Sequence, residues 1–321
     1  MTILITGAAG FIGAATAKKL LERGETVVGV DNLNSYYDVQ LKKDRLAELK
    51  TAPGFTFIEA DLADPSIAEK LSGHAIKRVI HLAAQAGVRY SIEAPQDYAA
   101  SNLTGFTNIL EFGRNAKVDH LVYASSSSIY GRNEQIPFSE DNRTDQPVSF
   151  YGATKKANEA MAYSYASLYQ LPLTGLRFFT VYGPMGRPDM AYMIFARKMT
   201  AGEPIQVFGQ GEMARDFTYI DDCVEGIIAA LGHPPADPDV PHRIYNLGND
   251  QPEKLGDFIG YLEAHLSITA DKQIKPMQMG DVRKTWANID RARAELGYDP
   301  KTSLDEGLKK FVDWYKDYYS Y

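Results

Sequence analysis

The sequence predicts an α/β fold, a doubly wound parallel sheet with a smaller C-terminal α/β lobe beside it. Short apolar runs rich in β-branched residues alternate with longer segments of helical periodicity through the first half of the 321 residues. The runs are also nearly continuous, which is typical of parallel strands that are covered on both faces. Strands that alternate with helices in this way build doubly wound sheets.

Five strands and three helices are expected in this first half. The strands are predicted over residues 3–6, 26–30, 55–59, 78–82 and 120–124, and the helices over residues 11–23, 102–115 and 151–169. After about Arg177 the pattern is less regular, and Pro and Gly cluster in GPMGRPDM, AGEPIQVFGQGE and HPPADPDVPH. We therefore expect a first domain of residues 1–178, to which some later segments return, and a second lobe of residues 179–321. A last helix is expected from the helical spacing of Leu304, Leu308, Phe311 and Tyr315.

Composition and charge narrow the class of protein. The net charge of −7 disfavours a nucleic-acid partner, because binding to phosphates needs a basic footprint. Cys223 is the single cysteine, so neither an internal disulfide nor a CxxC metal site can form, and we expect no metal. No apolar run approaches the roughly 18 residues that span a bilayer, and a strand expected from residue 3 leaves no room for a signal peptide. The expectation is a soluble, cytoplasmic protein with no membrane partner.

A glycine-rich turn directly follows the first expected strand. Gly7, Gly10 and Gly13 form GxxGxxG at the start of an expected helix. In this context glycines permit a tight turn and let the backbone approach a pyrophosphate at the helix N-terminus. A lone glycine motif is a weak signal, but here a strand precedes it and a helix follows it. Asp31 ends the second strand, where a carboxylate binds ribose hydroxyls and repels a 2′-phosphate. The sequence thus predicts a Rossmann domain that binds NAD rather than NADP.

Tyr151 and Lys155 lie one turn apart on one face of an expected helix. A YxxxK pair arises about once by chance in a chain with this many tyrosines and lysines, so its context decides. The run SSSS ends the fifth strand, at the sheet edge where open α/β folds bind ligands. A phenol is a poor base at neutral pH, but a nearby ammonium and a positive nicotinamide favour the phenolate. A serine can then orient the substrate oxygen. We therefore predict acid/base chemistry for hydride transfer at a carbinol carbon.

Several segments together carry a family resemblance that covers essentially the whole chain. They are TGAAGFIG, DNLNSYYD, HLAAQAGVRYS, YASSSSIYG, YGATKKANE, LRFFTVYGPMGRPDMA and RDFTYIDD. The sequence resembles the extended short-chain dehydrogenase/reductase superfamily and, within it, the nucleotide-sugar epimerases of the UDP-glucuronate 4-epimerase type. The resemblance implies that Ser126 is the catalytic serine beside Tyr151 and Lys155, whereas His81 is expected to be structural. It implies cofactor contacts at Gly7, Gly10, Phe11, Ile12, Gly13, Asp31, Asn32, Asp61, Leu62, Leu82, Ala83, Ala84, Ser125, Tyr151 and Lys155.

The resemblance also implies that the second lobe holds a UDP-sugar. Arg215 in RDFTYIDD matches an arginine that binds the diphosphate, a role that suits a bidentate guanidinium. Phe208 matches a position that borders the uracil, and Thr180 a substrate contact. A second phosphate arginine is out of register around MQMGDVRK, where Arg283 is the candidate.

Three further positions concern the sugar. The resemblance implies substrate contacts at Ser127 and Ser128, next to the catalytic serine. Arg187 in GRPDMA matches an arginine that meets the sugar carboxylate; the alternative is a loop arginine paired with Asp189. A carboxylate clamp of this kind would restrain the 4-keto intermediate, a β-keto acid, from losing carbon dioxide.

Related chemistries need other residues at these positions. A dehydratase resembling the dTDP-glucose enzymes needs an Asp–Glu pair where this chain has Ser127 and Ser128, and a UDP-glucuronate decarboxylase has Glu in place of Ser128. The resemblance therefore implies NAD-dependent C4 epimerisation of UDP-glucuronate to UDP-galacturonate, without net redox change and with tightly retained NAD. Epimerisation of UDP-glucose or a UDP-N-acetylhexosamine, decarboxylation, and a non-catalytic NAD-binding scaffold stay open. The resemblance also implies a homodimer in which the helices that start near Asn102 and Tyr151 pair with their copies as a four-helix bundle.

Overall fold

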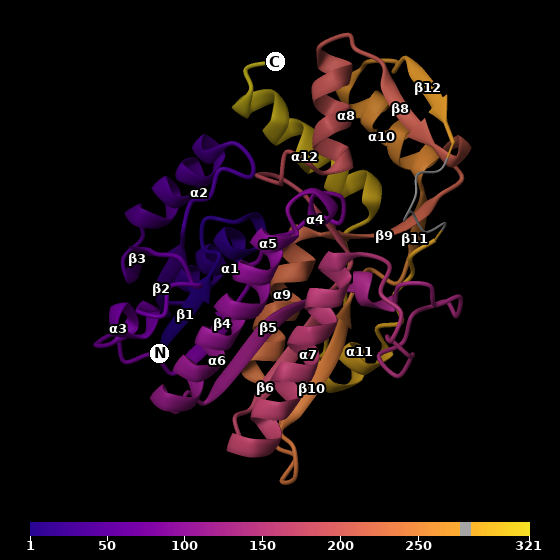
Figure 1. The fold of residues 1–321 in the computed structure, drawn as a ribbon. Helices are drawn as coiled ribbons and strands as arrows, with labels where there is room; N and C mark the ends of the chain where they lie inside the picture. Colours follow the sequence, from indigo (N-terminus) through magenta and orange to yellow (C-terminus); the bar gives the residue numbers. More distant parts are fainter. Residues whose placement is uncertain (277–283) are drawn as a thin grey trace.

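A seven-stranded parallel sheet forms the centre of the molecule (Figure 1), a computed structural model that describes residues 1–276 and 284–321. Its strands are β1 (Thr2–Thr6), β2 (Thr26–Asp31), β3 (Phe55–Glu59), β4 (Arg78–His81), β5 (His120–Ser126), β6 (Leu173–Phe178) and β10 (His242–Leu247). They lie in the order β10-β6-β5-β4-β1-β2-β3, and every neighbouring pair is parallel. The chain reverses its direction of travel between β4 and β1, and ligands bind at such a switch point in doubly wound sheets. The predicted fold class is confirmed.

Helices cover both faces of this sheet, as the near-continuous apolar strands predict. They are α1 (Phe11–Glu22), α2 (Val39–Thr51), α3 (Ile67–Leu71), α4 (Tyr90–Glu93), α5 (Pro95–Tyr98), α6 (Gly105–Ala116), α7 (Phe150–Tyr169), α9 (Ile220–Gly232) and α11 (Asp290–Leu296). On one face α1 packs against α9, where Ala17 and Ile227 are fully buried. On the other face α6 packs against α7, with Phe106 and Ala162 fully buried. Burial of an apolar side chain the size of Phe106 contributes about 1.5–3 kcal/mol to stability.

The helix predicted from residue 102 differs at its start. A π-helical turn, η1 (Ala99–Thr104), precedes α6. The carbonyl of Asn102 accepts a hydrogen bond from Asn158 Nδ2 at 2.7 Å, and its side chain bonds the backbone of Gln85. Side chains that take backbone groups out of the helical ladder favour such local widening. The π-helical turn also packs against α7, to which the bond from Asn158 ties it.

A second lobe stands above the carboxyl ends of the sheet strands in Figure 1. It contains a three-stranded sheet of β7 (Thr180–Tyr182), β9 (Ala214–Tyr219) and β11 (Pro252–Lys254), and a pair of β8 (Ile205–Phe208) and β12 (Lys272–Lys275). Its helices are α8 (Ala191–Thr200), α10 (Leu255–Leu266) and α12 (Leu304–Tyr318). The four apolar positions expected in the last helix are buried in α12, which packs on α10.

Three segments that follow residue 178 lie on the central sheet: β10 pairs with β6, α9 contacts β5 and β6, and α11 contacts β10. Residues 1–178 therefore do not complete the sheet by themselves. Across the described part of the chain, no helix is both long and apolar enough to span a bilayer.

Candidate active site

The glycine-rich turn connects β1 to α1 and opens a pocket at the switch point. Gly7 has a φ of +73°, which L side chains rarely adopt. A Cβ at Gly13 would lie 2.0 Å from the carbonyl oxygen of Gly7, so only glycine fits there. Asp31 supports the turn from the end of β2, because its carboxylate accepts hydrogen bonds from Ala9 N at 3.1 Å and Leu33 N at 2.9 Å. The turn leaves the N-terminus of α1 free to face an anionic group.

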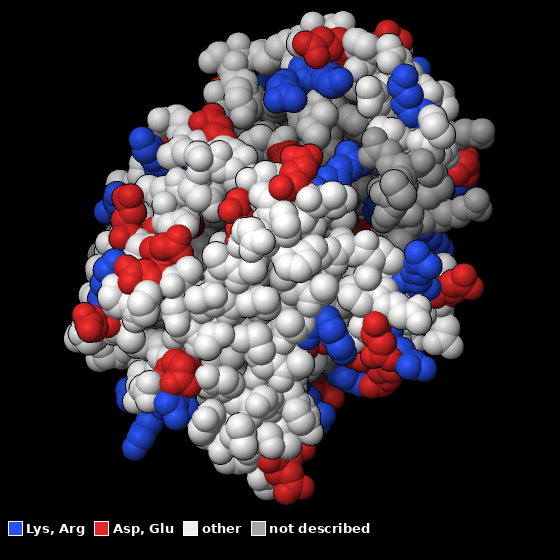
Figure 2. Space-filling view, in the orientation of Figure 1, with Lys and Arg blue, Asp and Glu red and all other residues white. Residues whose placement is uncertain are grey.

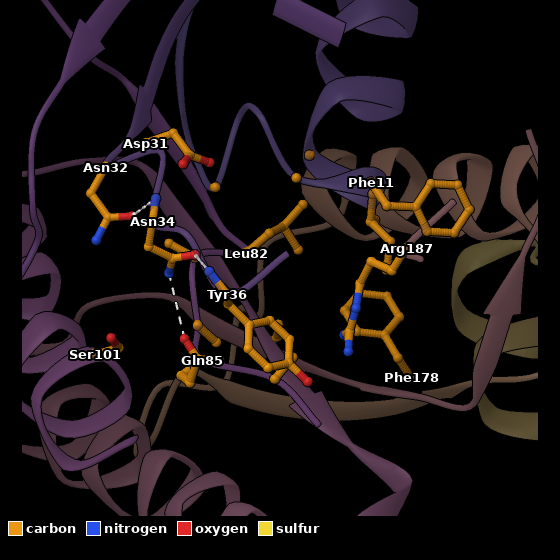
Figure 3. A pocket seen from close by; sticks show the side chains of 18 of the residues that line it. Phe11, Asp31, Asn32, Asn34, Tyr36, Leu82, Gln85, Ser101, Phe178 and Arg187 are labelled. Atoms are coloured by element: carbon orange, nitrogen blue, oxygen red, sulfur yellow. Dashed lines mark hydrogen bonds between the residues drawn. The ribbon is translucent and has the colours of Figure 1, made fainter. Parts of the chain in front are cut away.

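The structure brings the residues expected to bind the cofactor to this first pocket. It is lined by Gly7, Gly10, Phe11, Ile12, Gly13, Asp31, Asn32, Asp61, Leu62, Leu82, Ala83, Ala84, Ser125, Ser126, Tyr151 and Lys155, among others. Figure 3 shows Asp31 and Asn32 at one end and Phe178 and Arg187 at the other. Asn32 Nδ2 donates to Asp61 Oδ2 at 3.1 Å and so joins the ends of two strands. A glycine cradle with a carboxylate at one end fits a dinucleotide, NAD.

The catalytic candidates meet where β5 faces the first turn of α7. Ser149 caps α7 by accepting from Gly152 N at 3.0 Å, which fixes the turn that carries Tyr151. Ser126 ends β5, and its hydroxyl oxygen accepts a hydrogen bond from Ser128 N at 3.2 Å. The side chain of Lys155 is buried, and its Nζ donates to the Ala124 carbonyl at 2.8 Å. Three potential proton-handling groups thus share one corner of the pocket.

Burial changes the proton affinity of two groups in this corner. Burial raises the pKa of Tyr151, and a hydrogen bond with Ser126 and the positive charge of Arg187 oppose that rise. Burial lowers the pKa of Lys155 to about 7. The Nζ of Lys155 also donates to the Ala124 carbonyl, so the ammonium is held at the end of β5.

A buried ion pair between Arg177 and Glu159 contacts the end of β5 and the turn that follows it. Glu159 follows Tyr151 by two turns of α7, on the same face. Its carboxylate accepts from Ser125 Oγ at 2.7 Å and from Arg177 Nε and Nη2 at 2.9 Å each. Arg177 also donates to the hydroxyl of Tyr130, at the end of the 3-10 turn η2 (Ser127–Tyr130). Helix α7, the end of β5 and the end of β6 are therefore connected by one buried network.

His81 lies beside this corner but has a structural environment. Its Nδ1 is 2.8 Å from Thr6 Oγ1, and its ring stacks on Phe106. Burial lowers the pKa of His81 to about 3, so the ring is neutral at physiological pH.

A second pocket lies in the adjoining lobe. It is lined by Tyr36, Gly87, Val88, Arg89, Tyr90, Thr180, Arg187, Asp189, Met190, Ala191, Ile194, Phe195, Lys198, Gln206, Phe208, Met213, Arg215, Phe217 and Leu255. Thr180 and Arg215 come from the paired strands β7 and β9, and Phe208 ends β8. Together with Arg187, these three residues place four of the predicted substrate contacts in one pocket. Ser127 and Ser128 are in η2 and are not among the described residues that line either pocket. Arg283 lies outside the described residues.

The two pockets meet at Tyr36, Arg187 and Met190, which line both. The Arg187 side chain is 22% exposed and paired with Asp189. The hydroxyl of Tyr36 donates to the same carboxylate at 3.1 Å, and burial beside Asp189 raises the pKa of Tyr36 to about 12. The structure therefore contains the Arg187–Asp189 ion pair, which was the alternative to a contact between Arg187 and the sugar carboxylate. It also places this arginine at the junction between the two pockets.

Sequence reasoning missed several residues at the junction and in the second pocket. Tyr36 follows β2, and Arg89 follows β4, with its guanidinium carbon 5.9 Å from the centre of the Phe208 ring. Lys198 lines the same pocket from α8. Tyr36 and Arg89 could have been predicted, because segments that directly follow parallel strands lie at the edge of the sheet where ligands bind. Lys198 has no such signal, because it lies on a helix of the other lobe.

Comparison with known proteins places the chain in a family. Residues 3–248 match the NAD dependent epimerase/dehydratase family, and the chain belongs to it. UDP-glucuronate 4-epimerase 1 from Arabidopsis thaliana is 47% identical over 335 residues, covering 100% of this chain and 78% of that protein. A probable UDP-glucuronate 4-epimerase from Rhizobium meliloti (strain 1021) is 46% identical, covering 99% of this chain and 98% of that protein.

A solved structure is similar over the whole chain. UDP-glucuronic acid 4-epimerase from Bacillus cereus, in complex with UDP-glucuronic acid and NAD, superposes with a TM-score of 0.92. It is 36% identical, and the match covers 99% of this chain and 100% of that chain. The predicted family is confirmed, and NAD is the cofactor of the family.

Proposed function

We propose that this protein catalyses the NAD-dependent C4 epimerisation of UDP-glucuronate to UDP-galacturonate through a UDP-4-keto-hexuronate, with no net redox change. The observation that carries the proposal is the junction of a dinucleotide pocket with a strongly cationic second pocket at Arg187 and Tyr36. The similarity over the full chain to UDP-glucuronate 4-epimerases supports the same reaction.

The charges of the second pocket favour a uronate over a neutral sugar. Arg89, Arg187, Lys198 and Arg215 line it, and Asp189 is the one carboxylate among the described lining residues. UDP-glucuronate carries a diphosphate and a carboxylate, so its charge of about −3 complements this lining better than the charge of UDP-glucose does. Arg215 and Phe208 are the proposed partners of the diphosphate and the uracil.

Each catalytic candidate has a separate proposed task. NAD, when bound, accepts the hydride from C4 and returns it to the opposite face of the sugar. Tyr151 takes the proton of the 4-hydroxyl and gives it back, acting as base and then as acid. Ser126 orients the oxygen at C4 by a hydrogen bond, and Lys155 holds positive charge near the phenolate. Ser127, Ser128 and Thr180 are proposed to contact the sugar as it turns.

Arg187 is proposed to hold the uronate carboxylate. The 4-keto intermediate is a β-keto acid, and it loses carbon dioxide when its C5–C6 bond aligns with the carbonyl π system. A guanidinium that fixes the carboxylate restrains this rotation and keeps the charge on the acid. The position of Arg187 at the junction of the two pockets supports this role.

A two-fold dimer is the proposed assembly. Figure 2 shows a broad surface without charged side chains over α6 and α7. Tyr163 and Leu168 on α7 are 54% and 69% exposed, and no described element of the chain covers them. Large apolar side chains exposed together often mark an interface. Pairing of α6 and α7 with their copies in a four-helix bundle would bury these residues.

A panel of UDP-sugars tests the proposed reaction. UDP-glucuronate, UDP-glucose, UDP-N-acetylglucosamine and UDP-xylose are incubated separately with the enzyme, and NMR follows inversion at C4. We expect UDP-galacturonate as the main product and the fastest turnover. Faster inversion of a neutral sugar would replace the uronate assignment, a pentose product would indicate decarboxylation, and no turnover of any sugar would favour the non-catalytic scaffold.

A further inference from the structure

Arg45 is a buried arginine that connects the two lobes. It lies on α2, with 3% of its surface exposed. Its Nη1 donates to the carbonyl of Ala9 at 3.0 Å and to the hydroxyl of Tyr37 at 2.8 Å. Nε and Nη2 donate to the carbonyl of Met185 at 3.0 and 2.6 Å, and Nη2 also reaches the carbonyl of Gly186 at 3.1 Å. All five N–H groups of one guanidinium are therefore used.

The acceptors of Arg45 identify the segments that it fixes. Ala9 belongs to the glycine-rich turn of the cofactor pocket. Met185 and Gly186 immediately precede Arg187, and Met185 has a φ of +57°, a conformation that a β-carbon disfavours. Residues 45 and 185 are 140 positions apart in sequence. One planar side chain therefore sets the distance between the cofactor turn and the turn that presents Arg187.

Among the described residues, the guanidinium of Arg45 has no carboxylate as a hydrogen-bond or ion-pair partner. Burying an unpaired charge is costly unless something compensates it. Lys42, one turn earlier on α2, is also buried and donates to the carbonyl and side chain of Asn34. Lys42 lines the cofactor pocket, so its charge and that of Arg45 one turn away favour an anionic group in that pocket, as the diphosphate of NAD would be.

We propose that Arg45 is a positioning residue that couples cofactor retention to recognition of the sugar carboxylate. It holds the Met185–Gly186 turn against the glycine-rich turn, so that Arg187 points to the junction of the two pockets only when both turns are in place. The carboxylate half of this inference rests on the proposed function of Arg187. The cofactor half does not depend on it.

Arg45→Lys tests the inference, because lysine keeps the charge but cannot hold both turns with one rigid fork. NAD release is measured by rapid gel filtration of the loaded enzyme, followed by quantification of the NAD that stays bound. We expect release at least about tenfold faster than in the parent protein, the scale of one lost hydrogen bond to a charged group. The ratio of kcat/KM for UDP-glucuronate to that for UDP-glucose should fall in parallel.

Leu46→Ala is the matched control, since Leu46 is the next residue of α2, is 2% exposed and belongs to the hydrophobic core without a polar group that could hold either turn. This variant should lower the melting temperature and leave NAD release and the sugar ratio unchanged. In Arg45→Lys/Arg187→Ala the ratio should equal that of Arg187→Ala alone, because Arg45 acts through Arg187. Parental NAD release in Arg45→Lys, or equally fast release in Leu46→Ala, would overturn the positioning role. If Arg187→Ala leaves the sugar ratio unchanged, the function proposed for Arg187 fails, and NAD release still decides the role of Arg45.

Discussion

Arg187 and Asp189 form a bidentate ion pair at the junction of the two pockets. Arg187 Nε lies 3.0 Å from Asp189 Oδ1, and Nη2 lies 2.5 Å from Oδ2. Oδ2 also accepts the hydroxyl of Tyr36. A substrate carboxylate that binds Arg187 would therefore share one guanidinium with Asp189, which uses Nε and Nη2. Selectivity for uronates would then depend on how much binding a second carboxylate gains from an arginine that already has an acidic partner.

Arg187→Ala should weaken the use of UDP-glucuronate far more than that of UDP-glucose. Loss of a charge-assisted hydrogen bond in a closed site costs about 1.5–3 kcal/mol, or roughly tenfold to hundredfold in kcat/KM. The freed carboxylate should also raise the share of UDP-pentose by-product, which mass spectrometry resolves. Asp189→Asn is the control that removes the competing charge, and it should lower KM for UDP-glucuronate. Equal losses on both sugars in Arg187→Ala would defeat the specificity claim.

Tyr151→Phe should abolish most turnover without disturbing binding. Removal of a general acid/base typically costs about 10²-fold or more, and the ring itself stays in place. NAD content and UDP affinity, measured by calorimetry, should be nearly unchanged. Tyr261→Phe, on α10 and away from both pockets, is the matched control. Retention of most activity in Tyr151→Phe would remove this residue from its role.

Lys155→Met should move the pH dependence of kcat. A positive neighbour favours the phenolate, so its loss raises the pKa of Tyr151, and the rising limb of the profile shifts upward by about one pH unit or more. In the parent protein the pKa of Lys155 is lowered to about 7 by burial. Its charge is therefore full below neutral pH and fades as the pH rises through 7. A profile of unchanged position in Lys155→Met would show that the ammonium does not act on Tyr151.

Glu159→Gln should destabilise the fold strongly. The Glu159 and Arg177 side chains are 7% and 5% exposed, and the substitution leaves the guanidinium buried without its partner. Breaking such a pair costs about 3–5 kcal/mol. Chemical denaturation measures the loss. Glu111→Gln, in the half-exposed pair with Arg114, should cost under about 1 kcal/mol. Similar losses in the two variants would contradict the assignment of Glu159 to a buried network.

Leu168→Arg should shift the assembly toward monomers. Leu168 is 69% exposed on α7, so in an isolated chain the substitution is tolerated, whereas in a four-helix bundle it buries a charge. Light scattering across micromolar concentrations should give the dimer mass for the parent protein and a lower mass for the variant. A monomer mass for the parent protein at all concentrations would rule out the dimer.

The features that depend on local periodicity and on backbone conformation were predictable from the amino-acid sequence alone. Parallel strands buried on both faces read as continuous apolar runs, and the glycine turn is recognisable because only glycine tolerates its conformation at Gly7 and its close contact at Gly13. The position of Tyr151 and Lys155 on one helix face follows from the helical repeat alone.

Contacts between groups that are far apart along the chain became visible only in the folded structure. The contacts of Arg45 with Met185, of Tyr36 with Asp189 and of Arg177 with Glu159 join segments 140, 153 and 18 residues apart. The strength of such contacts depends on how deeply the groups are buried and on which partner each one meets, and the spacing of residues along the chain predicts neither. The hydrogen bond of Lys155 with Ala124, and the pairing of Arg187 with Asp189, are set in the same way by what surrounds each charge once water is excluded.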